Sequence, residues 1–145
     1  GYVHDQNCYA MGGVSGHAGL FSTAFDIHTF IHQFVACYRG HSDWIHQETI
    51  ADFLDRRHIG AIAEASHLCG WDTPGTAHSQ AGQYFSTNAV GHLGYTGCSM
   101  WIDLARDWWI ILLTNRVHPT TDNESIKNFR PMLHDLVYSQ LVQEK

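Results

Sequence analysis

The most distinctive stretch of the sequence alternates glycine with polar and aromatic residues, Gly91-His92-Leu93-Gly94-Tyr95-Thr96-Gly97. Glycine within a strand marks a place where a ligand or another backbone approaches closely. An imidazole beside such glycines can offer an anionic substrate group a hydrogen bond or, once protonated, a positive charge. His92 is therefore a candidate anion-binding residue, although a histidine on a solvated strand face would give the same pattern.

No serine carries the local signature of a catalytic nucleophile. The run Gly13-Val14-Ser15-Gly16-His17 approaches the Gly-x-Ser-x-Gly turn of esterases, but His17 takes the place of the second glycine. We interpret this run as a flexible glycine loop. None of the nine serines has a lysine three positions later, the spacing at which a lysine one helical turn away activates the hydroxyl.

The twelve histidines and four cysteines form no metal-binding pattern. His28 and His32 have the i, i+4 spacing of two ligands on one helix, but Thr29 stands where zinc proteases have glutamate, and no third ligand is identifiable. We interpret the pair as a solvated helix flank and predict no metal and no cofactor. The cysteines lie about thirty residues apart without a CxxC pair, which favours free, mostly buried thiols.

Composition narrows the class of protein. The chain has 145 residues, of which 44% are hydrophobic and 15% charged, so it can bury one core. The net charge of -6, without a stripe of lysine and arginine, argues against a nucleic-acid partner. No apolar run approaches the roughly 18 to 20 residues of a membrane span. The chain begins with Gly1 rather than Met, and we expect it to be part of a larger domain.

Three helices are predicted from apolar periodicity. Residues 23–38 combine a Thr23–Asp26 capping pattern with one apolar stripe that ends at Gly40. A shorter helix is expected over 47–57, with Ile50, Phe53 and Leu54 inward. The third, over 125–143, includes Pro131 and carries its apolar stripe on Ile126, Phe129, Leu133, Leu136, Val137 and Leu141.

The second half of the chain changes to strand-like patterning. Strands are predicted over 89–94, 98–103 and 108–115, and the short turn 104–107 makes the last two an antiparallel hairpin. Residues 68–72 resemble a short strand, and residues 1–20 are expected to be loop. Because the strand from Trp108 is apolar on both faces, something must cover each face. The predicted fold class is α+β, an antiparallel meander packed by helices.

Several of these segments together resemble the beta-lactamase-related serine hydrolases. The resemblance rests on the following segments, in this order: Val3-His4-Asp5-Gln6-Asn7, Gly12 to Ala24, Gly91-His92-x-Gly94-Tyr95-Thr96-Gly97, Trp101-Ile102-Asp103 and Leu112 to Pro119. The family includes class C beta-lactamases and D-Ala-D-Ala carboxypeptidases, and the similarity is greatest to the branch of penicillin-binding protein 4B. The resemblance covers nearly the whole chain but only the C-terminal part of the family's domain.

The resemblance implies a mechanism and assigns part of it to this chain. In the family, a serine in Ser-x-x-Lys forms an acyl-enzyme, Tyr-x-Asn assists proton transfer, and a Lys-Thr-Gly-like triad binds the substrate carboxylate. Neither of the first two motifs occurs here. His92-Leu93-Gly94 takes the place of the triad, and the Tyr95 backbone N–H is the implied oxyanion donor. In the alternative register, Tyr95-Thr96-Gly97, Thr96 supplies a substrate-binding hydroxyl.

The expected whole protein is thus a serine hydrolase acting on an amide or ester of the beta-lactam or D-Ala-D-Ala class. Its substrate would be a small molecule or a peptidoglycan peptide, and the 145 residues alone are expected to be inactive. The alternative is a non-catalytic remnant of the fold that binds peptidoglycan or a partner protein. The resemblance implies a bacterial, periplasmic or otherwise extracytoplasmic protein. Self-association through exposed apolar surface is also expected if part of the domain lies outside the chain.

Overall fold

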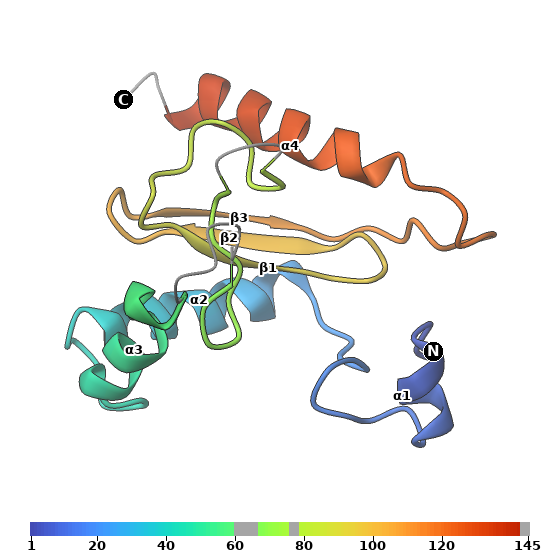
Figure 1. Cartoon of the computed structure of the whole chain (residues 1–145), viewed down its shortest axis with the longest axis horizontal. Helices are drawn as coiled ribbons and strands as arrows, with labels where there is room; N and C mark the ends of the chain where they lie inside the picture. The colour runs from blue at the N-terminus through green and yellow to red at the C-terminus, as the bar shows by residue number, and fades with distance from the viewer. Residues whose placement is uncertain (60–66, 76–78, 143–145) are drawn as a thin grey trace.

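The computed structural model describes residues 1–59, 67–75 and 79–142. A three-stranded antiparallel sheet lies between helix α4 on one side and helices α2 and α3 on the other (Figure 1). This is an α+β arrangement, as predicted. The elements are α1 (Gln6–Ala10), α2 (Ala24–Tyr38), α3 (Gln47–Phe53), a 3₁₀ helix (Arg56–Ile59), β1 (Val90–Leu93), β2 (Ser99–Asp103), β3 (Trp108–Leu112), α4 (Ile126–Val137) and a π-helical end (Tyr138–Val142).

Helix α2 matches its prediction because the cap and the apolar stripe that define it both lie within the helix and its first turn. The Thr23 hydroxyl accepts the Asp26 N–H at 3.2 Å and closes the first turn, as an N-cap does. Its stripe buries Ile31, Phe34 and Val35 against the sheet, while Phe30 stays partly exposed beside Trp44. Helix α3 is shorter than the predicted 47–57, and of its three expected inward residues only Ile50 is fully buried.

The strands pair in the order β1-β2-β3, each a little shorter than predicted. Two apolar clusters form, one on each face of this sheet. Val90 and Ile102, which are directly opposite in the register, join the cluster on the α2 side. Trp101 and Ala89 belong to the second cluster, on the α4 side. All five residues of β3 are only half-buried, so its two faces are covered incompletely.

Two expectations, one of a loop and one of a strand, were wrong. Within residues 1–20, Gln6–Ala10 form a helix that Asp5 caps, and five residues are too few to reveal a period in the sequence. Residues 68–72 form a turn rather than a strand, because the Leu68 N–H donates to the carbonyl of Trp71, three residues later, at 2.7 Å. Only Asp72 at the end of this turn pairs with the edge of β1, at Gly91.

The inward face of α4 was predicted only in part: of the six stripe residues, Ile126, Leu133 and Val137 are half-buried. Arg130 and His134 are buried beneath this helix, whereas Phe129, Leu136 and Leu141 are exposed. Polar contacts with residues 80–83 and 97 turn the helix this way, as the next subsection describes. Pro131 lies inside α4, and the Lys127 carbonyl that a proline cannot engage accepts the side-chain amide of Gln80 at 3.1 Å instead. Residue 143, the last of the predicted helix, lies outside the described residues.

Candidate functional site

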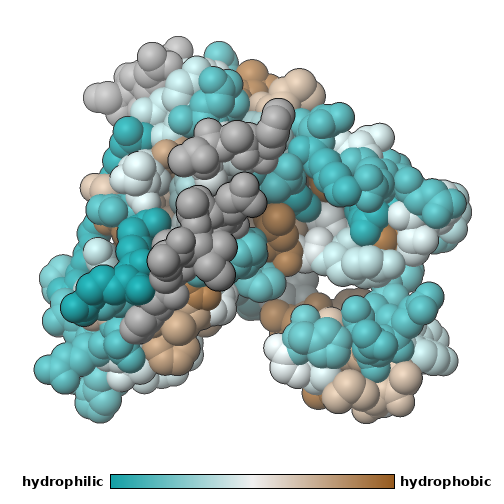
Figure 2. Space-filling model, viewed as in Figure 1, coloured by the Kyte–Doolittle hydropathy of each residue, from teal (hydrophilic) through white to brown (hydrophobic). Residues whose placement is uncertain are grey.

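The predicted site residues lie at one end of the sheet, where β1 turns into β2. His92 stands opposite Met100 in the register, two residues from the Val90–Ile102 pair, so it shares the face of the sheet that α2 covers. Its side chain is exposed. The same end of the sheet faces the separate lobe that holds α1 (Figure 1), and Figure 2 shows the molecule hollowed between that lobe and the remainder.

A tight turn follows His92 and contains the other predicted residues. The Gly94 N–H donates to the Cys98 carbonyl at 2.7 Å, and the Gly97 N–H donates to the Gly94 carbonyl at 2.9 Å. Tyr95 projects from this turn with 46% of its surface exposed. Within the described part of the chain, the Tyr95 N–H donates to no other group. The turn therefore presents a backbone donor that a ligand could use.

Arg116 holds this turn from the segment after β3. Its Nε donates to the Tyr95 carbonyl at 3.0 Å, and its guanidinium lies 5.1 Å from the centre of the Tyr95 ring. The Arg116 backbone N–H donates to the Thr96 carbonyl at 2.8 Å. Sequence reasoning gave Arg116 no role, because its contact with Tyr95 crosses twenty-one positions.

Arg130 holds the same turn from α4. Its Nη2 donates to the Gly97 carbonyl at 2.9 Å and its Nη1 to the Gln80 side chain at 2.6 Å, with the residue only 4% exposed. Burial lowers the pKa of this guanidinium, although it stays charged at neutral pH. Gly97 has φ +97°, and a Cβ there would lie 2.6 Å from the Thr114 hydroxyl. Only glycine fits this position of the turn without strain.

The two registers of the triad place different side chains toward solvent. In the first, His92 is exposed and Leu93 belongs to the cluster on the opposite face. In the second, the Thr96 hydroxyl lies 3.4 Å from the Cys98 sulfur and is half-buried. His92, Gly94, Tyr95 and Thr96 thus occupy one strand end, and His92 is the exposed side chain that can carry charge.

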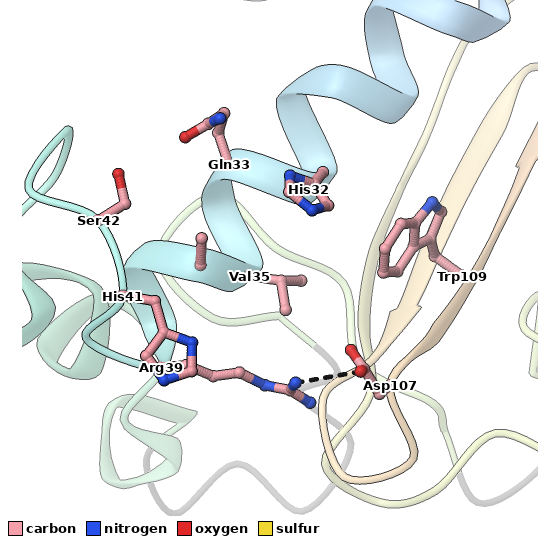
Figure 3. Close-up of a pocket in the computed structure, with 9 residues that line it drawn as sticks. His32, Gln33, Val35, Arg39, His41, Ser42, Asp107 and Trp109 are labelled. Carbon is pink, nitrogen blue, oxygen red and sulfur yellow. Dashed lines mark hydrogen bonds and ion pairs between the residues drawn. The ribbon is translucent and has the colours of Figure 1, made fainter.

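A second hollow, of about 450 Å³, contains none of these residues (Figure 3). It lies beside the end of α2 and the β2–β3 turn, where Arg39 Nη1 and Asp107 Oδ2 form an ion pair at 3.0 Å. His32, His41 and Trp109 also line it. Its charged groups, Arg39 and Asp107, pair with each other, so its walls show no clear preference for one ligand charge.

The two histidines of α2 have contacts of their own. The His28 ring accepts the Trp109 indole N–H at 3.1 Å, and its centre is 6.4 Å from that of His32. Both residues are exposed, as expected for a solvated helix flank. Among the described residues, no group of three or more histidine, cysteine or acidic side chains could hold a metal. Cys8 and Cys37 are buried free thiols, Cys98 is half-buried, and Cys69 is exposed.

Comparisons with known proteins agree with this fold. The sequence model of the Beta-lactamase family matches residues 2–130. An "N-acetylmuramyl-L-alanine amidase" of Bacillus subtilis is 36% identical over an alignment of 134 residues, which covers 88% of this chain and 29% of the relative. A "Putative D-alanyl-D-alanine carboxypeptidase" of Salmonella agona is 34% identical over 130 residues, 87% of this chain and 29% of the relative.

A solved structure supports the same assignment of fold. A beta-lactamase from Mycobacterium bovis superposes with a TM-score of 0.65 over 92% of this chain and 53% of its own, at 18% sequence identity. The chain belongs to the beta-lactamase family, whose members are serine hydrolases. It spans 29% of the length of the curated relatives named above. No described helix is long and apolar enough to cross a membrane.

Proposed function

We propose that this chain forms the substrate-carboxylate and oxyanion side of the active site in a serine hydrolase. The whole protein would cleave an amide or ester of the beta-lactam or D-Ala-D-Ala peptide class through an acyl-serine. The observation that carries this proposal is the end of β1, where an exposed His92 stands three residues before an unpaired Tyr95 N–H.

The polar groups around this strand end suit a carboxylate. The His92 side chain is exposed at the end of β1, and a protonated imidazole pairs with a carboxylate. Two arginines hold the adjoining turn, so permanent positive charge lies close to it. The Cβ position at Gly94 lies 3.2 Å from the Cys98 Cβ, so glycine allows the two arms of the turn to approach closely. Thr96 can supply a hydroxyl if the second register is used.

The Tyr95 N–H is suited to an oxyanion. A backbone donor stabilises a tetrahedral intermediate when it is fixed in place before the reaction. Arg116 and Arg130 fix this turn through the carbonyls of Tyr95, Thr96 and Gly97. The backbone around this donor would therefore need little reorganisation when negative charge develops on the substrate oxygen.

The acylated serine and the proton-transfer residues would lie outside these 145 residues. The chain contains neither Ser-x-x-Lys nor Tyr-x-Asn, and its curated relatives are more than three times as long as the matched part. We infer that the chain alone does not react with beta-lactams or cleave D-Ala-D-Ala peptides. We place the whole protein in a bacterial periplasmic or extracytoplasmic compartment, where peptidoglycan peptides occur, in keeping with its bacterial relatives.

Self-association is a further part of this proposal. Phe129, Met132 and Leu136 follow one another at i, i+3 and i+7 on the outer side of α4, with exposed fractions of 43%, 64% and 56%. Contiguous apolar side chains of this kind favour contact with a second surface. Sedimentation of the chain should show a concentration-dependent dimer that Leu136→Glu abolishes. A clean monomer at all concentrations would contradict it.

Ligand binding to the chain tests the carboxylate assignment. Titration with a diacylated Lys-D-Ala-D-Ala peptide should shift the NMR amide signals of His92, Gly94 and Tyr95. His92→Ala should weaken this binding, whereas His92→Lys should strengthen it at neutral pH, because lysine keeps a full charge there. The same peptide with a C-terminal amide is the control and should not bind.

Three results would count against the proposal. Equal shifts with the acid and the amide would show that no carboxylate is recognised at this strand end. Covalent labelling of the chain by a penicillin would show that its own residues supply the acylated nucleophile. Binding without any activity in a longer chain that carries Ser-x-x-Lys would instead favour the non-catalytic remnant.

A further inference from the structure

The glycine-rich segment after α1 is anchored rather than free. Asp5 caps α1 by accepting the Cys8 N–H at 2.7 Å, and the buried Cys8 thiol donates to the Ala18 carbonyl at 3.2 Å. Gly19 packs so tightly against this helix, at φ +105°, that a Cβ would lie 2.9 Å from the Cys8 sulfur. These contacts fold residues 12–19 back over α1.

This folding brings an aspartate, a histidine and a serine into one line of hydrogen bonds. His17 Nε2 lies 3.0 Å from Asp5 Oδ1, and His17 Nδ1 lies 2.9 Å from the Ser15 hydroxyl. A carboxylate can only accept, so Nε2 carries a proton and, in the neutral ring, Nδ1 is the acceptor for the Ser15 O–H. The serine also has a weaker acceptor, the Ala18 carbonyl at 3.4 Å.

The electrostatics of this line favour proton transfer from the serine to the histidine. The Cys8 N–H and the His17 ring together lower the pKa of Asp5, so its carboxylate is charged at neutral pH. A carboxylate bonded to one ring nitrogen stabilises the imidazolium that forms when the other nitrogen takes a proton. The roles of the two nitrogens are exchanged relative to chymotrypsin-like proteases, but the order of the groups is the same.

A hollow of about 650 Å³ is lined by Val14, the residue directly before Ser15. Its walls include Val14, Tyr2, Tyr9 and Phe21, and glycines form much of the remainder. Ser15 itself is half-buried and His17 half-exposed, so a small ligand can approach the hydroxyl from solvent. Aromatic and aliphatic walls of this kind suit an uncharged acyl group.

We propose that Ser15, His17 and Asp5 form a second nucleophilic centre that is acylated by uncharged aromatic or aliphatic esters. The Ser15 oxygen attacks the ester carbonyl while His17 Nδ1 takes the hydroxyl proton. The tetrahedral intermediate then expels the alcohol, which takes that proton back, and the acyl group stays on Ser15. Water, deprotonated by His17, releases the acid and restores the serine.

This centre is independent of the proposed function. It uses none of the residues from His92 to Thr96. With this centre, the chain alone is expected to be inactive toward beta-lactams and D-Ala-D-Ala peptides but not toward uncharged esters. Failure of peptide binding at His92 would leave it untouched. Failure of labelling at Ser15 would likewise leave the carboxylate site untouched.

Labelling with a neutral alkyl fluorophosphonate tests the centre. The serine oxygen displaces fluoride from phosphorus, and peptide mass spectrometry locates the adduct. We expect the adduct on Ser15, at a rate that falls about 100-fold in His17→Gln, as for loss of a general base. Asp5→Asn should slow it at least about tenfold. Asparagine can still cap α1, so the fold is retained, which circular dichroism checks.

The chain offers two matched controls. Ser22→Ala removes an exposed serine of the same segment and should leave the rate unchanged. Ser99 also lies beside a histidine, at 3.4 Å from His134, but it is buried and should stay unlabelled. An adduct elsewhere, no adduct, or a rate on Ser15 that His17→Gln changes less than about twofold would overturn the proposal.

Discussion

Arg116 and Tyr95 contact each other twice, through the backbone and through the ring. The Arg116 Nε donates to the Tyr95 carbonyl at 3.0 Å, while the guanidinium lies 5.1 Å from the centre of the aromatic ring. The same side chain uses its Nη1 to reach the carbonyls of Thr121 and Asn123. One residue therefore ties the turn that carries the candidate oxyanion donor to the loop before α4.

Arg116→Lys should loosen that turn. Lysine keeps the charge but lacks the planar group that bonds and stacks at once, so we expect a loss of about 1–2 kcal/mol in the free energy of unfolding. Hydrogen exchange of the amides of 94–97 should speed up in parallel. Arg57→Lys, at an exposed residue, is the control and should change neither. Unchanged exchange in R116K would mean that Arg130 alone fixes the turn.

Gly91→Ala should disrupt the β1–β2 pair. A Cβ at Gly91 would lie 2.6 Å from the Met100 carbonyl and against the Trp101 ring, both of which are held in the core. We expect a loss of about 2–3 kcal/mol in the free energy of unfolding, measured with urea. Gly16→Ala adds the same methyl group where nothing lies within 4 Å, so its effect should stay within about 0.5 kcal/mol. Equal effects would contradict the close packing at Gly91.

Asp103→Asn should destabilise the β2–β3 hairpin although it changes only one atom. The carboxylate is fully buried; Oδ2 accepts the Ser86 N–H, and Oδ1 accepts the Ala105 and Arg106 N–H groups. In either amide orientation, an NH₂ group faces a backbone N–H. The expected loss is about 2–4 kcal/mol by thermal or urea unfolding. Asp107→Asn, at the exposed turn, should lower stability by less than about 1 kcal/mol.

His134 should make the chain less stable below neutral pH. Burial lowers the pKa of His134 from its usual 6.5, so the unfolded chain takes up its proton at a higher pH than the folded chain. The contribution of the neutral ring is therefore complete above pH 6.5 and is lost as the pH falls below it. Urea unfolding at pH 7.5 and 5.5 should show this decline. His134→Asn should reduce it, and the exposed His32→Asn should not.

Local sequence patterns were enough to predict the elements whose defining contacts lie within a few residues of one another. The capping of α2 by Thr23 and its apolar stripe are both local, and so is the short turn between β2 and β3. Such signals depend on periods of 3.6 and 2 that survive any tertiary arrangement. The prediction of a strand over 89–94 also placed His92 correctly within β1. The role of that residue stays a prediction.

Sequence patterns could not reveal which side chains and backbone groups contact each other when they lie far apart in the sequence. The sequence favours Phe129 and Leu136 as the inward face of α4, but the structure buries Arg130 and His134 there, because Gly97 and Ala81 offer carbonyls that need donors. The contact of Asp5 with His17 spans twelve positions and converts an apparent glycine loop into an ordered line of hydrogen bonds. Period and propensity describe one element at a time, whereas hydrogen-bond partners are chosen only when distant segments are packed together.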